Sequence, residues 1–314
     1  MTTSNTIDTL FEHRASYPDF EKKERLDRLV GLDDKKDRLA KMIGMLIDKT
    51  RLKRWLEHYH PESDLNLDNL LRRPPLVVLS GDVGSGKTEL AETIGDLVAR
   101  QNNIDLMLFP LSLSTRGQGR VGEMTQLLAS AFDYTVKEAE KLKSQTSSKA
   151  RGGIILLIDE ADALAQSREN AQMHHEDRAG VNAFIRGIDR IANAQLPVVV
   201  IMCTNRLSAL DPAVRRRAAD ILTFHRPDEI QRRSLLEKNL APLNVSSQDI
   251  DRLIEITGGK NNYSIPYTFS DITHRLIPNI ILNAFPSKPV NGSDAISLAE
   301  ALMPTPPFQD KSIV

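Results

Sequence analysis

Short apolar runs alternate with segments of helical periodicity through the middle of the chain. After the Pro74-Pro75 pair, residues 76–80 form an apolar, β-branched run that stops at Gly81, as a buried strand of a parallel sheet would. Similar runs lie at 105–111, 154–158, 197–203 and 221–224, and apolar residues at helical spacing fill 87–101, 122–143 and 178–192. Strands that alternate with helices predict an α/β fold in which a parallel sheet is flanked by helices.

The two ends of the chain follow other patterns. Residues 1–27 are polar and charged and carry no strand signal, which predicts a polar N-terminal arm that either forms one or two surface helices or is mobile. Strand patterns stop further along, so we expect a large α/β domain over residues 28–226 and a small α-helical lid domain over residues 227–285. The segment 286–314 contains five prolines. We expect it to be largely irregular, with one helical turn near residues 295–302.

The composition excludes several classes of protein. The chain has 314 residues, with 41 Lys+Arg against 42 Asp+Glu and a formal net charge of −1. This balance makes nucleic-acid binding a weak expectation, although a local basic channel stays open. The single cysteine, Cys203, permits no internal disulfide, which favours a reducing compartment. No apolar run approaches the roughly 20 residues of a membrane helix, and no signal-peptide pattern opens the sequence. We therefore expect a cytoplasmic protein without membrane contact.

One motif in the chain matches G-x-x-x-x-G-K-[ST] in full. It lies after an apolar run and before a helical pattern, as a phosphate-binding loop requires. Glycines let backbone N–H groups turn toward the β- and γ-phosphates, Lys87 supplies positive charge, and the hydroxyl of Thr88 is suited to bind Mg²⁺. The residues expected to bind ATP are Gly81, Asp82, Val83, Gly84, Ser85, Gly86, Lys87 and Thr88.

Two adjacent carboxylates, Asp159 and Glu160, follow the apolar run at 154–158. Ligands bind at the carboxyl ends of strands in open α/β sheets. Asp159 is suited to hold a Mg²⁺-bound water and joins Thr88 as a candidate for the metal site. Glu160 is the candidate base that orients and polarises the attacking water. Together with the glycine-rich loop, this pair predicts an ATPase that uses ATP and Mg²⁺.

With these motifs the sequence resembles the AAA+ ATPases over roughly residues 30–283. The segment that begins Val30-Gly31-Leu32 resembles the opening segment of that family, which implies that Val30 and Gly31 contact the adenine. Cys203-Thr204-Asn205 resembles the sensor-one motif of the family. The resemblance implies that Asn205 binds the γ-phosphate or the attacking water; an isolated asparagine after a strand would be a turn residue.

Three consecutive arginines, Arg215, Arg216 and Arg217, end a segment that resembles the arginine-finger segment of AAA+ proteins. A finger reaches the nucleotide of a neighbouring subunit and stabilises charge that develops on the transferred phosphoryl oxygens. The family spacing favours Arg216 and Arg217, with Arg215 as an alternative, and a solvated cationic patch is the simpler interpretation. A finger that acts in trans implies a homo-oligomeric ring, with a hexamer as the expected state.

Two stretches are expected to face the central pore of such a ring. Arg120-Val121-Gly122 stands where AAA+ remodelling proteins carry an aromatic–aliphatic–Gly loop that grips polypeptide, with Arg120 in the aromatic position. Val121 with arginine stems is the candidate grip, because those stems carry apolar methylene groups. An ordinary surface loop is the alternative. Residues 168–178 contain two adjacent histidines but lack the H-E-x-x-H spacing of a zinc site, so a second pore loop is favoured over a metal site.

The segment Phe269 to Pro278 resembles the sensor-two segment of the pachytene-checkpoint group of AAA+ remodelling proteins, with Arg275 at the sensor-two position. That group partly unfolds HORMA-domain proteins, and its bacterial members occur in anti-phage systems. The resemblance implies that Arg275 contacts the nucleotide, whereas a plain surface arginine is the alternative.

The motifs leave more than one function open. The main hypothesis is an ATP-hydrolysing ring that remodels a protein client, with a HORMA-domain signalling protein as the candidate. The alternative is a loader or nucleic-acid-handling ATPase in which ATP gates binding, and the arginines of the 116–120 stretch keep this open. A nucleotide-dependent scaffold without turnover is disfavoured by Glu160, because a pure binder gains nothing from a positioned base.

Overall fold

The computed structural model describes residues 10–65, 67, 73–113, 123–143, 152–164 and 175–307. These residues form two compact units: Met1–Asp27, Asp34–Ser80 and Thr88–Leu222 make the first, and Arg28–Asp33, Gly81–Lys87 and Thr223–Val314 make the second. The glycine-rich loop is thus grouped with the C-terminal helices rather than with the sheet.

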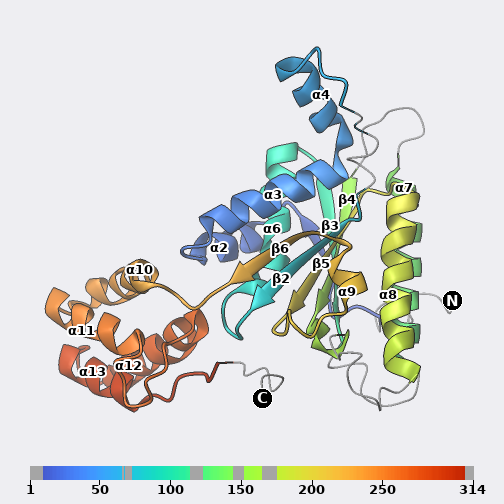
Figure 1. The fold of residues 1–314 in the computed structure, drawn as a ribbon. Helices are drawn as coiled ribbons and strands as arrows, with labels where there is room; N and C mark the ends of the chain where they lie inside the picture. Colours follow the sequence, from blue (N-terminus) through green and yellow to red (C-terminus); the bar gives the residue numbers. More distant parts are fainter. Residues whose placement is uncertain are drawn as a thin grey trace. The chain divides into compact units, whose positions relative to one another are not determined.

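A six-stranded sheet in the order β1-β3-β4-β5-β2-β6 forms the centre of the first unit (Figure 1). Its strands are β1 (Ala15–Tyr17), β2 (Leu76–Gly81), β3 (Asp105–Ser112), β4 (Gly152–Asp159), β5 (Val198–Thr204) and β6 (Ala218–Phe224). The pairs β3–β4, β4–β5 and β5–β2 are parallel. The carboxyl ends of β2, β3, β4 and β5 therefore share one edge of the sheet, which confirms the predicted α/β fold.

Helices cover both faces of this sheet. Helices α7 (Glu123–Leu142) and α8 (His175–Asn193) cover one face, and α3 (Asp33–Ile47) and α6 (Lys87–Asn102) cover the other (Figure 1). Strands β4 and β5 are almost fully buried, because helices lie against both of their faces. The shorter elements here are α2 (Phe20–Arg28), α4 (Lys49–Tyr59), the 3₁₀ turn η1 (Ala161–Leu164) and α9 (Pro212–Arg215).

The N-terminal segment differs from its prediction, because β1 lies where no strand was expected. It is only three residues long and pairs antiparallel with β3 at the sheet edge. Tyr17 is buried and its hydroxyl donates to the carbonyl of Glu92 on α6, while Arg25 on α2 forms ion pairs with Glu89 and Glu92 of the same helix. Residues 15–27 therefore belong to the packed first unit, and α2 is a helix, which was one of the two alternatives for this segment.

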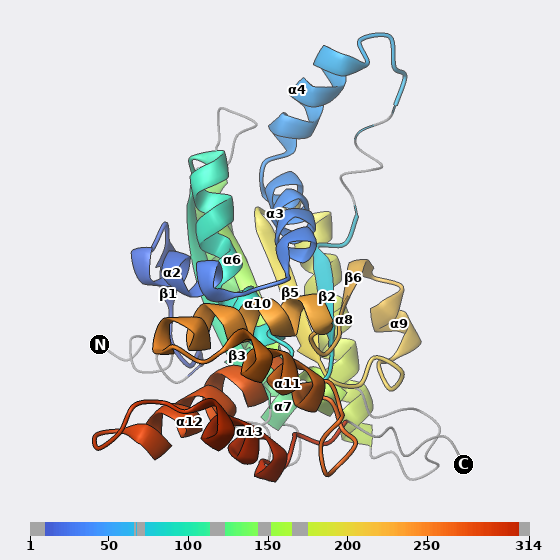
Figure 2. The same cartoon turned by 90° about the vertical axis from the view of Figure 1, so that its left-hand side faces the viewer.

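The C-terminal helices build a core of their own. They are α10 (Glu229–Leu240), the short η2 (Ala241–Leu243), α11 (Ser247–Thr257), the π-helical segment η3 (Asp271–Leu276), α12 (Ile277–Ala284) and α13 (Gly292–Ala301). Figure 2 shows α10 to α13 side by side, and Leu236, Leu253 and Leu276 are fully buried among them. The segment after residue 286 is less irregular than predicted, because Ala295 and Ala299 of α13 are also buried in this core.

Candidate functional site

The glycine-rich loop runs directly from the buried end of β2 into the first turn of α6. Gly81, Gly84 and Gly86 all have positive φ angles, of 152°, 72° and 92°. At Gly81 a Cβ atom would stand 2.1 Å from the carbonyl oxygen of Phe224, so only glycine fits there. The three glycines therefore adopt backbone conformations that other residues rarely adopt.

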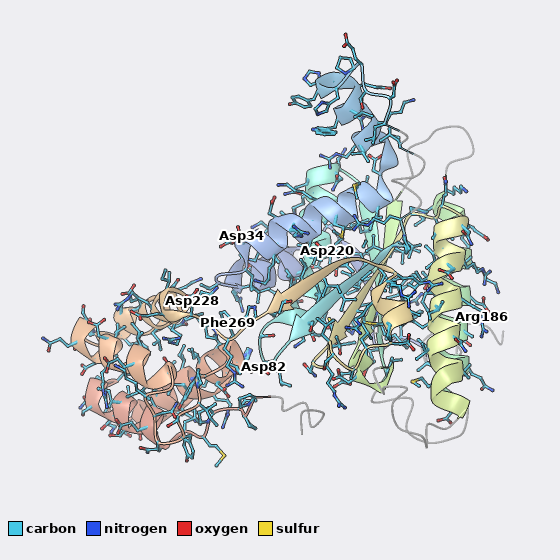
Figure 3. The ribbon with its side chains drawn as sticks, viewed as in Figure 1. Asp34, Asp82, Arg186, Asp220, Asp228 and Phe269 are labelled. Carbon is cyan, nitrogen blue, oxygen red and sulfur yellow. The ribbon has the colours of Figure 1, made fainter. Side chains whose placement is uncertain are left out.

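Lys87 is turned into the loop that precedes it. The side chain is buried, and its ammonium group donates to the carbonyl oxygens of Gly81 at 2.8 Å and Asp82 at 2.7 Å. The carboxylate of Asp82, labelled in Figure 3, accepts a hydrogen bond of 2.8 Å from Nε of Arg226. Thr88 follows at the start of α6, where the N-terminal end of a 16-residue helix favours anions.

Glu160 occupies a strained position just beyond the end of β4. Its φ angle of 52° lies in the left-handed region, and its N–H donates to Asp159 Oδ1 at 2.8 Å. The hydroxyl of Ser112 donates to Oε2 of Glu160 at 2.8 Å. Ser112 is the last residue of β3 and the register partner of Asp159. No local pattern in the sequence distinguishes Ser112, because only the strand register brings it next to the carboxylate pair.

Asn205 follows β5 and is held by Asp162, a residue to which the sequence analysis gave no role. The N–H of Asn205 donates to Oδ1 of Asp162 and its side-chain amide donates to Oδ2, both at 2.9 Å. The hydroxyl of Thr204 donates to Oδ1 at 2.6 Å. Asp162 lies in η1 just after β4. One carboxylate therefore fixes the end of β5 relative to the residues that follow β4.

The three arginines differ in their surroundings. Arg217 makes a two-pronged ion pair with Asp189 on α8, at 2.8 Å and 2.9 Å, and also donates to the carbonyl of Ala213. The hydrogen bond that Arg217 donates to Asp189 raises the pKa of Arg217. Arg215 and Arg216 are exposed, and neither side chain has a hydrogen bond or ion pair with any residue that the structure describes. Of the two arginines that the sequence favours, only Arg216 projects without an intramolecular partner of this kind.

Three further candidates, Val30, Gly31 and Arg275, lie in the second unit. The carbonyl of Gly31 accepts a hydrogen bond of 2.8 Å from Gln231, and Val30 packs against the core of the C-terminal helices. Gln231 belongs to the capping box that Asp228 forms at the start of α10 (Figure 3). Arg275 donates to Oδ1 of Asp271 at 2.7 Å.

Some predictions cannot be compared with the structure. Arg120, Val121 and Gly122 lie outside the described residues, as do residues 168–174 and the side chains of residues 175–178. Among the residues that are described, no group of three or more His, Cys, Asp or Glu side chains is arranged to hold a metal ion. No described helix is long and apolar enough to cross a membrane.

A known protein family and a curated relative match this chain. Residues 77–226 match the model of the AAA family, described as the ATPase family associated with various cellular activities. The chain is 61% identical to CD-NTase-associated protein 6 of Escherichia coli (strain MS 115-1), over 99% of this chain and 100% of that protein.

Two solved structures agree with the sequence match. In the E. coli MS115-1 HORMA:CdnC:Trip13 complex, one chain is 60% identical and has a TM-score of 0.87, over 96% of this chain and 99% of that one. The structure of Rhizobiales Trip13 is 48% identical with a TM-score of 0.72, over 95% and 100% of the two chains. These matches confirm the resemblance that the motifs predict. The chain therefore belongs to the AAA ATPases, in the group of CD-NTase-associated protein 6 and Trip13.

Proposed function

We propose that the protein is an ATP-hydrolysing AAA+ ring that remodels a HORMA-domain protein in a bacterial anti-phage system. This proposal is carried by similarity along almost the whole chain. The chain is 61% identical to a relative named for its association with a CD-NTase, and 60% identical to a chain solved in a complex with HORMA and CdnC. The sequence of this chain contains the complete glycine-rich loop, the carboxylate pair and the arginine segment of an active ATPase.

The loop residues fit a nucleotide and its Mg²⁺. The positive φ angles of the loop glycines leave room for phosphate oxygens close to the backbone, and Lys87 is already placed within the loop. Thr88 and Asp159 supply hard oxygen ligands of the kind that Mg²⁺ prefers. Val30 and Gly31 would contact the adenine. When bound, Mg²⁺ neutralises charge on the phosphates.

Glu160 and Asn205 would act on the attacking water and the γ-phosphate. Glu160 is the base that orients this water, and the hydrogen bond from Ser112 fixes where its carboxylate points. Asp162 fixes Asn205 in turn, which leaves the second N–H of the Asn205 amide to contact the γ-phosphate. Ser112 and Asp162 are thus positioning residues for the reaction.

Arg216 is the finger that this arrangement favours. It is exposed, and Arg217 beside it is bound to Asp189, so Arg217 orients the segment from which Arg216 projects. An arginine that completes the nucleotide site of a neighbour requires a homo-oligomer, and a hexamer is the state expected for this family. In this ring Arg120, Val121 and Gly122 would line the pore and contact the client.

The two candidate functions differ in the partner that should accelerate ATP hydrolysis. We expect the HORMA protein of the related E. coli complex to raise the ATPase rate of this protein, whereas duplex DNA leaves the rate unchanged, because a remodelling cycle is coupled to its protein client. Replacing Val121 and Gly122 by alanine should remove the stimulation but keep the basal rate. Stimulation by DNA alone, with a salt dependence that Arg120→Ala flattens, would instead support the nucleic-acid-handling alternative.

A further inference from the structure

A fully buried carboxylate, Asp271, lies at the start of the π-helical segment of the second unit. Oδ1 accepts hydrogen bonds from Arg275 at 2.7 Å and from the hydroxyl of Thr305 at 2.8 Å. Oδ2 accepts from the N–H groups of Thr268 and Thr305, both at 3.0 Å. Burial acts to raise the pKa of Asp271, but these hydrogen bonds outweigh it and leave the pKa below its usual value. The carboxylate is therefore charged at neutral pH and has four donors.

Asp271 also connects this helix to the glycine-rich loop. The hydroxyl of Thr268 accepts from the N–H of Asp271 while Asp271 accepts from the N–H of Thr268, a reciprocal cap of the helix that begins at Phe269 (Figure 3). Between these two residues, the N–H of Ser270 donates to the carbonyl of Gly84 at 3.1 Å. A Cβ atom on Gly84 would stand 2.8 Å from Ser270 and Thr268. The capped helix start therefore packs directly against the loop.

Thr305 brings the C-terminal segment into the same cluster. It lies beyond α13 and contributes two of the four donors to Asp271. Tyr267 fixes the end of α13 nearby, since its buried hydroxyl donates to the carbonyls of Ala299 and Leu302. Residues 34 positions apart in sequence are thus joined at one carboxylate.

A buried carboxylate that accepts four hydrogen bonds can lose one of them at a lower free-energy cost than a carboxylate with a single partner. If Arg275 leaves Asp271, three hydrogen bonds still satisfy the carboxylate, so the penalty of an unpaired buried charge is largely avoided. Arg275 is half exposed, with 42% of its side chain accessible, whereas Asp271 is fully buried. The arginine is therefore the mobile partner of the pair.

We infer that Asp271 is the resting counter-ion of Arg275 and that Thr305, from the C-terminal segment, positions Asp271 so that Arg275 can exchange this carboxylate for the phosphates of bound ATP. The inference rests on the proposed function, in which ATP binds at the loop, and on the contact with the nucleotide that the sensor-two resemblance implies for Arg275. It adds a positioning role for Asp271 and Thr305 and makes the C-terminal segment part of the control of nucleotide affinity.

Substitutions at the two positions should change affinity in opposite directions. In Asp271→Asn, the amide oxygen can still accept from the N–H groups of Thr268 and Thr305 while its NH₂ group donates to the Thr305 hydroxyl, so the cap is kept but Arg275 loses its acceptor. Arg275 is released and should bind phosphate more readily. In Thr305→Val, Oδ1 loses a donor and depends on Arg275 alone, so the arginine is held more firmly.

The test measures the Kd of a non-hydrolysable ATP analogue for the full-length protein. We expect Asp271→Asn to tighten binding and Thr305→Val to weaken it, each by about three- to tenfold, and Arg275→Ala to weaken it about tenfold or more. Thr273→Val is the matched control, because among the described residues the hydroxyl of Thr273 binds a carbonyl of its own helix, that of Phe269, and the neighbouring His274 ring. Binding in this control should equal that of the wild type.

Double variants separate positioning from a loss of folding. In an Arg275→Ala background, neither Asp271→Asn nor Thr305→Val should change the Kd further, whereas a merely structural defect would persist there. If Arg275→Ala weakens binding but the other two variants leave it unchanged or act independently of Arg275, the inference is overturned and the proposed function stands. If Arg275→Ala itself has no effect, both Arg275's assigned role and the inference fail. Binding that survives Lys87→Ala would count against the nucleotide site as a whole.

Discussion

Replacing Glu160 with glutamine is expected to lower the ATPase rate by about 10²- to 10⁴-fold and to leave ATP binding intact. Glutamine has nearly the same shape and can still accept from the hydroxyl of Ser112, but it cannot accept a proton from water. The rate is measured as phosphate release and binding is measured by titration with labelled ATP. Lys87→Ala should behave differently and lose tight binding, because the proposed role of Lys87 is to contact the phosphates before any reaction begins.

Glu62→Gln is a suitable control, because Glu62 is an exposed glutamate in the turn after α4 and should not affect either measurement. A Glu160→Gln protein that hydrolyses ATP at the wild-type rate would remove Glu160 from the reaction. A protein that also loses ATP binding would show that Glu160 acts in the ground state rather than on the attacking water.

Mixing two inactive variants is expected to restore hydrolysis. Subunits with Glu160→Gln keep the arginine finger, and subunits with Arg216→Ala keep the base. At a mixed interface, one intact base therefore faces one intact finger. Each variant alone should be nearly inactive, since loss of such a finger costs about 10³- to 10⁵-fold in rate. A substantial fraction of the wild-type rate should return on mixing, measured together with the mass of the assembly.

Variants of the neighbouring arginines decide which residue is the finger. Arg217→Ala breaks the ion pair with Asp189 and should lower activity by disturbing the segment, and Asp189→Asn should cause a similar loss if this positioning role is correct. Restoration with Arg215→Ala in place of Arg216→Ala would move the finger to Arg215. Mixtures that co-assemble but stay inactive would contradict a finger that acts in trans.

The sequence was informative wherever a pattern is local. The loop motif, the apolar strands and the helical periodicity each depend on neighbouring residues, and the structure confirms the fold that they predict. The strand β1 was missed because three residues are too few to show alternation and its pairing partners are 89 to 93 positions away in sequence. The helix α13 was predicted only as one turn, because nearby prolines obscure the small buried alanines that place it in the core.

The residues that support the site were missed for a different reason. Ser112 and Asp162 act on residues 48 and 43 positions away, and nothing in the local sequence distinguishes them from other polar residues near strand ends. The same holds for the ion pair between Arg217 and Asp189 and for the contact of Thr305 with Asp271. Such partners are set by strand register and tertiary packing, which a single sequence does not specify.

Hydrogen exchange of the HORMA protein from the related E. coli complex shows whether ATP hydrolysis by this ring remodels its client. With this protein and ATP, we expect amides of the HORMA protein to lose protection in a defined region, and Glu160→Gln with ATP to leave protection unchanged. The loss should also disappear with Val121→Ala/Gly122→Ala, whose basal ATPase persists. A HORMA protein that keeps full protection while the wild-type ring binds it and hydrolyses ATP would contradict the account.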